Sequence, residues 1–281
     1  MRWLGRRQST NIEDRRGAVP RRVVGGGCGT IVIILIVWLL GGNPLELLNN
    51  MSSSDQGSIS NYQATEEENQ LAQFVAVVLG DTEDVWSTIF RQEGSSYREP
   101  KLVLYTEAVQ SACGYSSAAT GPFYCPADEK LYIDLSFCQE LQQRFKAPGD
   151  FALAYVIAHE VGHHVQNLMG INDRVMAMRN RVSQREFNQI MVRLELQADF
   201  FAGVWAHHAQ KMKNILEEGD IEEALNAASA VGDDRIQKRT QGYVVPDAFT
   251  HGTSEQRMRW FAKGFKTGDI RQGDTFSAER L

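Results

Sequence analysis

The sequence predicts a mainly helical α+β protein that has a small β-sheet and is preceded by one transmembrane helix. Three observations lead to this prediction. In the second half of the chain, apolar residues recur at intervals of three and four, which is typical of helices packed on a core. Two short β-prone runs, residues 101–106 and 130–137, supply strands. Residues 23–45 contain no charged side chain, and this length is about what a bilayer requires.

Residues 1–22 are expected to form an arginine-rich cytoplasmic tail, and residues 23–45 a single-pass anchor in a bacterial inner membrane. Seven arginines and two acids give residues 1–27 a charge of +5. Because the whole chain has a net charge of −6, the remaining residues carry −11. Arginines in front of the apolar stretch and none behind it place the following domain in the periplasm or outside the cell. The alternatives are a cleaved signal peptide and a buried core helix, but no A-x-A cleavage site follows Leu40, which favours the anchor.

The rest of the chain is expected to be a linker, residues 46–65, followed by one domain, residues 66–281. With 43% hydrophobic residues overall, the chain can bury a core. Its acidic balance argues against binding nucleic acid, which needs clustered lysine and arginine. In order, the predicted elements are helices 66–80 and 82–94 (capped by Thr82), strands 101–106 and 130–137, helix 151–168 (capped by Asp150), a helix from the Ser183/Glu186 capping box to about residue 212, and helices starting at Asp220 and at Thr253/Gln256.

Three cysteines follow the apolar stretch: Cys113, Cys125 and Cys138. In an oxidising compartment, Cys113 and Cys125 can close a short loop and leave Cys138 as a buried thiol. The odd number leaves a bond between Cys125 and Cys138 as the alternative.

The stretch "AHEVGHHVQ" contains a candidate metal site. His159 and His163 are four residues apart, so on a helix both imidazoles lie on one face and can reach one metal ion. Glu160 lies beside them, where its carboxylate can take a proton from a metal-bound water. The same spacing also occurs on ordinary polar helix faces, so the prediction depends on further ligands elsewhere in the chain.

A second stretch, "RLELQADFFAG", supplies those ligands. Glu195 and Asp199 are also four residues apart, among large apolar residues, and burying two carboxylates there costs several kcal/mol unless charge partners compensate. With two histidines and a zinc ion, Glu195 completes a His2Glu set that keeps one position open, as catalytic zinc requires. Asp199 would accept the N–H of a ligand histidine. The alternative is that both carboxylates face solvent.

These stretches, together with "SACGYSSAATGPFYCP", "LYIDLSF" and "FTHGTSEQRMRWF", resemble the bacterial membrane-anchored neutral zinc metallopeptidases over the whole chain. The resemblance implies a zincin-like fold and a gluzincin-type site, with HExxH at His159, Glu160 and His163, and ExxxD at Glu195 and Asp199. More distant similarity to integral-membrane zinc proteases of the CAAX and stress-response type implies that His251 and Arg257 hold the oxyanion of the reaction. The alternative is that His251 caps a helix and Arg257 forms a structural ion pair.

The sequence therefore predicts a zinc-dependent metalloendopeptidase that acts on protein or peptide substrates. The strand at residues 130–137 is expected to be the sheet edge along which a substrate adds. His164, His207 and His208 are expected to stay outside the metal site, and Tyr155 to pack in the core or line the cleft. The alternative function is a non-catalytic envelope scaffold that zinc stabilises, although a structural site has no need of Glu160 and normally fills its fourth position.

Overall fold

The computed structural model describes residues 1–18, 62–117, 120–143 and 145–281. The anchor predicted at residues 23–45 and most of the predicted linker lie outside these ranges. Within them, no helix combines the length and apolar character needed to cross a membrane. Met1–Arg16 and Ala64–Leu281 belong to one compact unit, which is described below.

This unit is mainly helical with two small sheets, in agreement with the predicted α+β class. Its strands are β1 (Ile12–Asp14), β2 (Lys101–Tyr105), β3 (Ala108–Ser111), β4 (Gly114–Ser117), β5 (Phe123–Cys125) and β6 (Lys130–Asp134). Its α-helices are α3 (Glu66–Gln92), α4 (Ser136–Gln143), α5 (Asp150–Leu168), α6 (Ile171–Met176), α7 (Gln184–Lys213), α8 (Asp220–Ala230), α9 (Asp233–Gln241) and α10 (Ser254–Thr267). Two short 3-10 helices, η2 (Pro246–Ala248) and η3 (Ile270–Gln272), flank α10.

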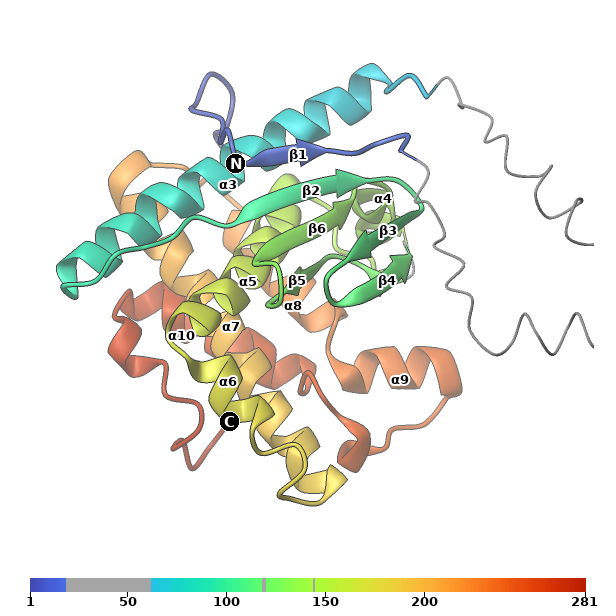
Figure 1. The fold of residues 1–281 in the computed structure, drawn as a ribbon, viewed down its shortest axis with the longest axis vertical. Coiled ribbons are helices and arrows are strands. Elements are labelled where there is room, and N and C mark those ends of the chain that lie inside the picture. The colour runs from blue at the N-terminus through green and yellow to red at the C-terminus, as the bar shows by residue number, and fades with distance from the viewer. Residues whose placement is uncertain (19–61, 118–119, 144) are drawn as a thin grey trace, which may run out of the picture. The chain divides into compact units, whose positions relative to one another are not determined.

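The larger sheet has the strand order β1-β2-β6-β5 (Figure 1). β1, β2 and β6 run parallel, and β5 is antiparallel to β6. The prediction that the strand at residues 130–137 forms a sheet edge is wrong, because β6 lies between β2 and β5. The strand also ends early, at Asp134, whose carboxylate accepts the N–H groups of Ser136 and Glu107 and so starts α4.

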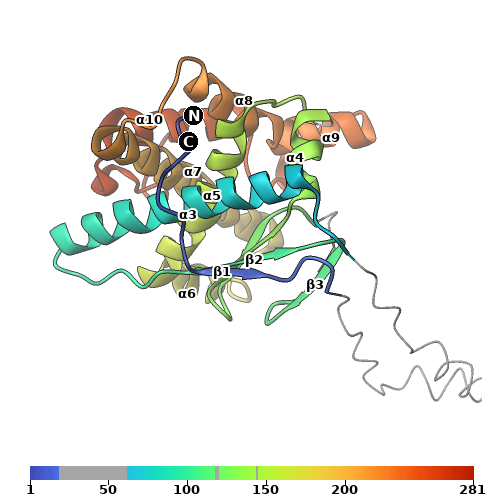
Figure 2. The same ribbon diagram turned by 90° about the horizontal axis from the view of Figure 1, so that it is seen from above.

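The two faces of this sheet are covered differently. Leu102, Leu104, Leu131 and Ile133 join the main core with the helices, and α3, α5 and α7 lie over that face (Figure 2). Val103, Tyr105 and Tyr132 form a smaller cluster with Val109 of the β3–β4 hairpin. Alternate residues of each strand therefore face opposite layers, as a pleated strand requires.

Local capping signals located two helix starts correctly and misplaced others. α7 and α10 begin with the predicted capping boxes at Ser183 and Thr253. The two predicted helices of residues 66–94 form a single helix, α3, and Thr82 does not cap it, since its hydroxyl donates to the carbonyl of Leu79 within the helix. The N-cap of α5 is Gly149, and Asp150 is the first helical residue.

Helices α5, α7 and α10 pack closely because glycines lie at their contacts. A Cβ on Gly162 of α5 would lie 2.9 Å from the carbonyl oxygen of Ala198 on α7. Gly203 of α7 and Gly264 of α10 leave even less room for a side chain at the contact between those helices. Such contacts bring polar side chains from three helices to one point in the core.

Candidate metal centre

Three of the predicted ligands meet between α5 and α7. His159 and His163 project from α5 toward Glu195 of α7, and their ligand atoms all lie within 4.8 Å of one another. Oε2 of Glu195 is 3.2 Å from Nε2 of His159 and 3.5 Å from Nε2 of His163. The i, i+4 spacing places both imidazoles on one helix face, and α7 supplies the third ligand from the opposite side.

The other ring nitrogen of each histidine has its own partner. Nδ1 of His159 lies 2.8 Å from Oδ1 of Asp199, and Nδ1 of His163 lies 2.9 Å from Oε1 of Gln166. With Nδ1 donating to these oxygens, both Nε2 atoms carry lone pairs that face Glu195. Two imidazole nitrogens and a carboxylate oxygen are donors that fit zinc.

Gln166 was missed by the sequence analysis. It is fully buried, and its amide nitrogen donates to the carbonyl of Leu194, 2.7 Å away, and to Oε1 of Gln197. These bonds leave Oε1 of Gln166 facing His163. The spacing of three residues from His163 on the same helix was the signal that could have identified it.

Asp199 is the centre of a buried hydrogen-bonded cluster. It is completely shielded from solvent and accepts bonds from His159, from the hydroxyl of Tyr155 and from both Nε and Nη2 of Arg257, at 2.8 and 2.9 Å. Burial opposes ionisation of Asp199, but the charge of Arg257 and the hydrogen bonds from His159 and Arg257 outweigh it and lower the pKa to about 2. Asp199 is therefore a carboxylate that orients His159.

Arg257, predicted as an oxyanion donor, is paired with Asp199 at the wall of the cavity. Its side chain is buried, lines the cavity described below, and directs its guanidinium at Asp199. This two-point contact corresponds to the alternative interpretation, a structural ion pair.

His251 lies in the loop before α10, with Nδ1 3.1 Å from Oδ1 of Asp233. The other oxygen of Asp233 accepts the backbone N–H groups of Thr250, His251 and Gly252, at 2.7 to 3.1 Å. One carboxylate thus fixes both the loop and the imidazole of His251. Asp233 was missed because its partners are far from it in sequence and make mostly backbone contacts.

A cavity of about 630 Å³ brings the predicted site residues together. Its polar lining includes His159, Glu160, His163, Glu195, His251 and Arg257. Its apolar wall includes Phe123, Phe137, Val156, Met176, Leu194 and Ile236. Burial raises the pKa of Glu160 above its usual value. The lining also includes Phe123 and Tyr124 of β5, an edge strand of the described sheet.

The remaining histidines make structural contacts. His164 is fully buried, its Nε2 donates to the carbonyl of Arg98 at 2.6 Å, and its Nδ1 accepts the hydroxyl of Tyr124 at 3.0 Å. Burial lowers the pKa of His164. His207 and His208 contact the carbonyls of Phe265 and Gly268 near the end of α10.

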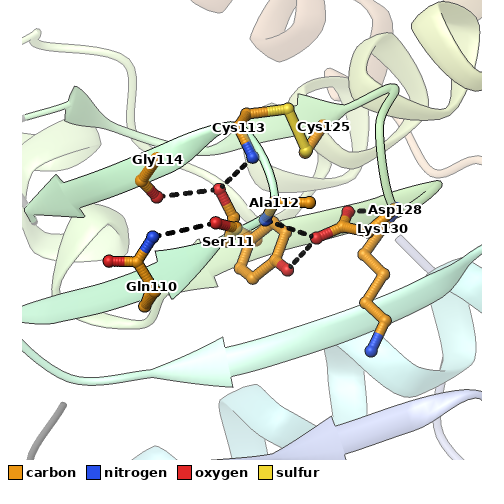
Figure 3. The surroundings of a disulfide bond; sticks show 9 residues. Gln110, Ser111, Ala112, Cys113, Gly114, Cys125, Asp128 and Lys130 are labelled. Carbon is orange, nitrogen blue, oxygen red and sulfur yellow. Dashed lines mark hydrogen bonds between the residues drawn. A yellow bond between two sulfur atoms is a disulfide. The ribbon is translucent and has the colours of Figure 1, made fainter. Parts of the chain in front are cut away.

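A disulfide connects the cavity wall to the small hairpin. Cys113, in the turn between β3 and β4, is bonded to Cys125 of β5, with an S–S distance of 2.02 Å (Figure 3). Asp128 supports the same region by accepting the N–H of Ala112 and the hydroxyl of Tyr132. Cys138 is a buried free thiol.

Two crossing helices that present a His2Glu donor set at a cavity, with a glutamate directly after the first histidine, have the architecture of zinc-binding hydrolases. Comparison with known families agrees with this class. The chain belongs to the family described as "Putative neutral zinc metallopeptidase", whose model matches residues 1–276.

Two bacterial proteins named as uncharacterized are similar to the chain. The chain is 47% identical to the uncharacterized protein YpfJ of Escherichia coli K12 over 98% of its own length and 99% of that relative. It is 42% identical to the uncharacterized protein Rv2575 of Mycobacterium tuberculosis H37Rv over 76% of its own length and 73% of that relative. No solved structure matches the chain.

Proposed function

We propose that this protein is a zinc-dependent endopeptidase in which His159, His163 and Glu195 hold the metal. The observation that carries the proposal is the convergence of these three side chains, with each histidine oriented by a buried partner and Glu160 at the same cavity. Membership in a zinc metallopeptidase family supports the same reaction class. A site that only fastens two helices has no need of an additional carboxylate in the cavity.

The protein side chains divide the work as follows. Bound zinc supplies a Lewis acid that polarises the scissile carbonyl and makes a water acidic. Glu160 accepts the proton of the attacking water and delivers a proton to the leaving amine. Asp199 and Gln166 keep both histidines in the tautomer that presents Nε2 to the metal.

His251 is the donor proposed for the oxyanion. It lines the cavity, and its contact with Asp233 through Nδ1 leaves Nε2 for a substrate. Asp233 acts as a positioning residue, because it holds the loop and the ring together. Arg257 stabilises the site through Asp199, and its two-point contact there argues against a direct role at the substrate carbonyl.

The substrate proposed is an extended peptide. β5 is an edge of the described sheet and lies beside the metal residues, so a peptide can add to it as a further strand. The apolar wall suits aliphatic or aromatic side chains of such a peptide.

The test is a Glu160→Gln variant beside wild type and Glu222→Gln, a matched change on the exposed face of α8. Wild type and Glu222→Gln should cleave a quenched casein substrate and bind about one zinc ion per chain. Glu160→Gln should keep the zinc and lose cleavage by a factor of at least about 100. Glu195→Ala should lose the metal. Zinc without any cleavage by wild type would favour the scaffold function instead.

A further inference from the structure

Residues 1–16 are built into the folded domain. β1 pairs in parallel with β2, and the N–H of Leu102 donates to the carbonyl of Asn11 at 2.8 Å. The N–H of Ser9 donates to the carbonyl of Ala76 in α3 at 2.9 Å. Figures 1 and 2 show β1 beside β2, close to α3. The segment therefore adds a strand to the sheet and packs against a helix.

A buried carboxylate of α3 depends on this segment. The side chain of Glu83 is 2% exposed. In the described part of the chain, its side-chain hydrogen bonds come from Arg7 at 2.9 Å, from Asn11 at 2.9 Å and from the hydroxyl of Ser9. A buried charge that loses its partners destabilises a protein strongly. Without residues 7–11, the folded domain would contain such a charge.

A glycine in α3 makes room for the same segment. A Cβ on Gly80 would lie 3.1 Å from the carbonyl oxygen of Arg7 and 3.2 Å from the nitrogen of Ser9. Glycine inside a helix is unfavourable relative to alanine. The close approach of the segment gives a physical reason for this residue, and it is independent of the contacts of Glu83.

The arginines of the segment are also engaged. Arg6 pairs with Asp81, whose side chain is 1% exposed, at 2.7 Å, and Arg7 also pairs with Asp84 at 2.8 Å. Arg16 donates to the carbonyl of Glu68 at the start of α3. All three arginines therefore bind the segment to α3.

We propose that residues 1–16 and the domain of residues 64–281 lie on the same side of any membrane that the apolar stretch contacts. One crossing places the two ends of a span on opposite sides, and two crossings need about 40 apolar residues. The uncharged stretch has 23. Because Arg16 and Ala64 belong to one compact unit, a single crossing by residues 23–45 is incompatible with this fold.

Cysteine labelling of the full-length chain in bacterial spheroplasts tests the proposal. Gln8→Cys reports on the segment and Ser95→Cys on the domain, since both residues are exposed. Each variant also carries Cys28→Ser, and the other cysteines are disulfide-bonded or buried. With a membrane-impermeant maleimide, we expect both positions to label equally in intact spheroplasts, or both only after lysis. Labelling of one before lysis and of the other only after lysis would overturn the proposal.

A second measurement tests whether residues 1–16 are bound to α3. It decides the proposal if either cysteine is unreactive after lysis. Arg7→Met and Glu83→Gln are combined in a double-mutant cycle on the full-length protein. We expect the two changes to be coupled by more than tenfold in the unfolding equilibrium constant. Independent effects would show that the segment is not bound to α3, and the proposal would then be wrong.

Discussion

Replacing Arg257 by methionine tests what this arginine does in the site. The change keeps an unbranched apolar side chain and removes the guanidinium that contacts both oxygens of Asp199. Asp199 is fully buried and Arg257 is 4% exposed. Because neither charge can be hydrated, we expect the loss to appear first as reduced stability.

The magnitude follows from what remains around Asp199. Breaking a buried ion pair by removing one partner costs about 3–5 kcal/mol. Tyr155 and His159 still donate to Asp199 in the variant, so we expect the lower end of this range, about 3 kcal/mol. Adding Asp199→Asn removes the isolated charge. The double variant should therefore be more stable than additivity predicts, by about 2 kcal/mol.

Urea unfolding of all four proteins measures this coupling, with a chelator present so that zinc does not contribute. Arg259→Met is the matched control on the same helix, since its partner Glu255 is exposed, and a pair of this kind contributes about 0–1 kcal/mol. Additivity within about 0.5 kcal/mol would refute the ion pair. If kcat then fell while KM and zinc content stayed constant, Arg257 would be the oxyanion donor that the family resemblance implies.

Three further predictions concern other parts of the fold. Gly162→Ala should lower stability by about 1–3 kcal/mol and weaken zinc binding in a competition assay, because the new methyl group meets the carbonyl of Ala198. A higher melting temperature of the variant would contradict the close contact between α5 and α7. Burial raises the pKa of Cys138 to about 12, so mass spectrometry should detect maleimide on it at pH 8 only after denaturation, and modification of native protein would refute its burial. A hydrogen bond from Lys130 is the largest cause that lowers the pKa of Glu13 from 4.5 to about 2. The stability that the ionised Glu13 provides is therefore complete above about pH 4.5 and is lost as the pH falls toward 2. The difference in stability between wild type and Glu13→Gln should narrow over that interval. An unchanged difference would contradict the pairing of Glu13 with Lys130.

The sequence predicted well those features that depend on neighbours within one or two helical turns. The capping boxes of α7 and α10 locate helix starts because both partners lie within four residues. The ligand pair His159 and His163 and the pair Glu195 and Asp199 were proposed from the same kind of spacing. The structure brings three of these side chains together at one point and the fourth behind His159.

Features that depend on distant partners were misjudged or missed. Gly80 and Thr82 look locally like a helix end and a new cap, yet α3 continues through them because residues 7–9 cover this stretch. Asp233 orients His251 across 18 positions, and the chain shows no spacing signal for it. The ion pair of Arg257 likewise joins it to a partner 58 positions away.

Composition alone does not separate two uses of the arginines near the amino terminus. Arginines before an apolar stretch predict the orientation of that stretch in a membrane, whereas arginines of a folded domain pair with its acids. Arg21 and Arg22 lie outside the described residues, but the other five each make a hydrogen bond or ion pair within the compact unit, to the residues Asn214, Asp81, Glu83, Glu13 and Asp14 among others. Local sequence does not distinguish arginines that orient a membrane span from arginines that pair with the folded domain, because the carboxylates of α3 lie about 75 positions further along the chain. The paired strand β1, the close contact at Gly80 and the buried acids Asp81 and Glu83 favour arginines that hold the domain together.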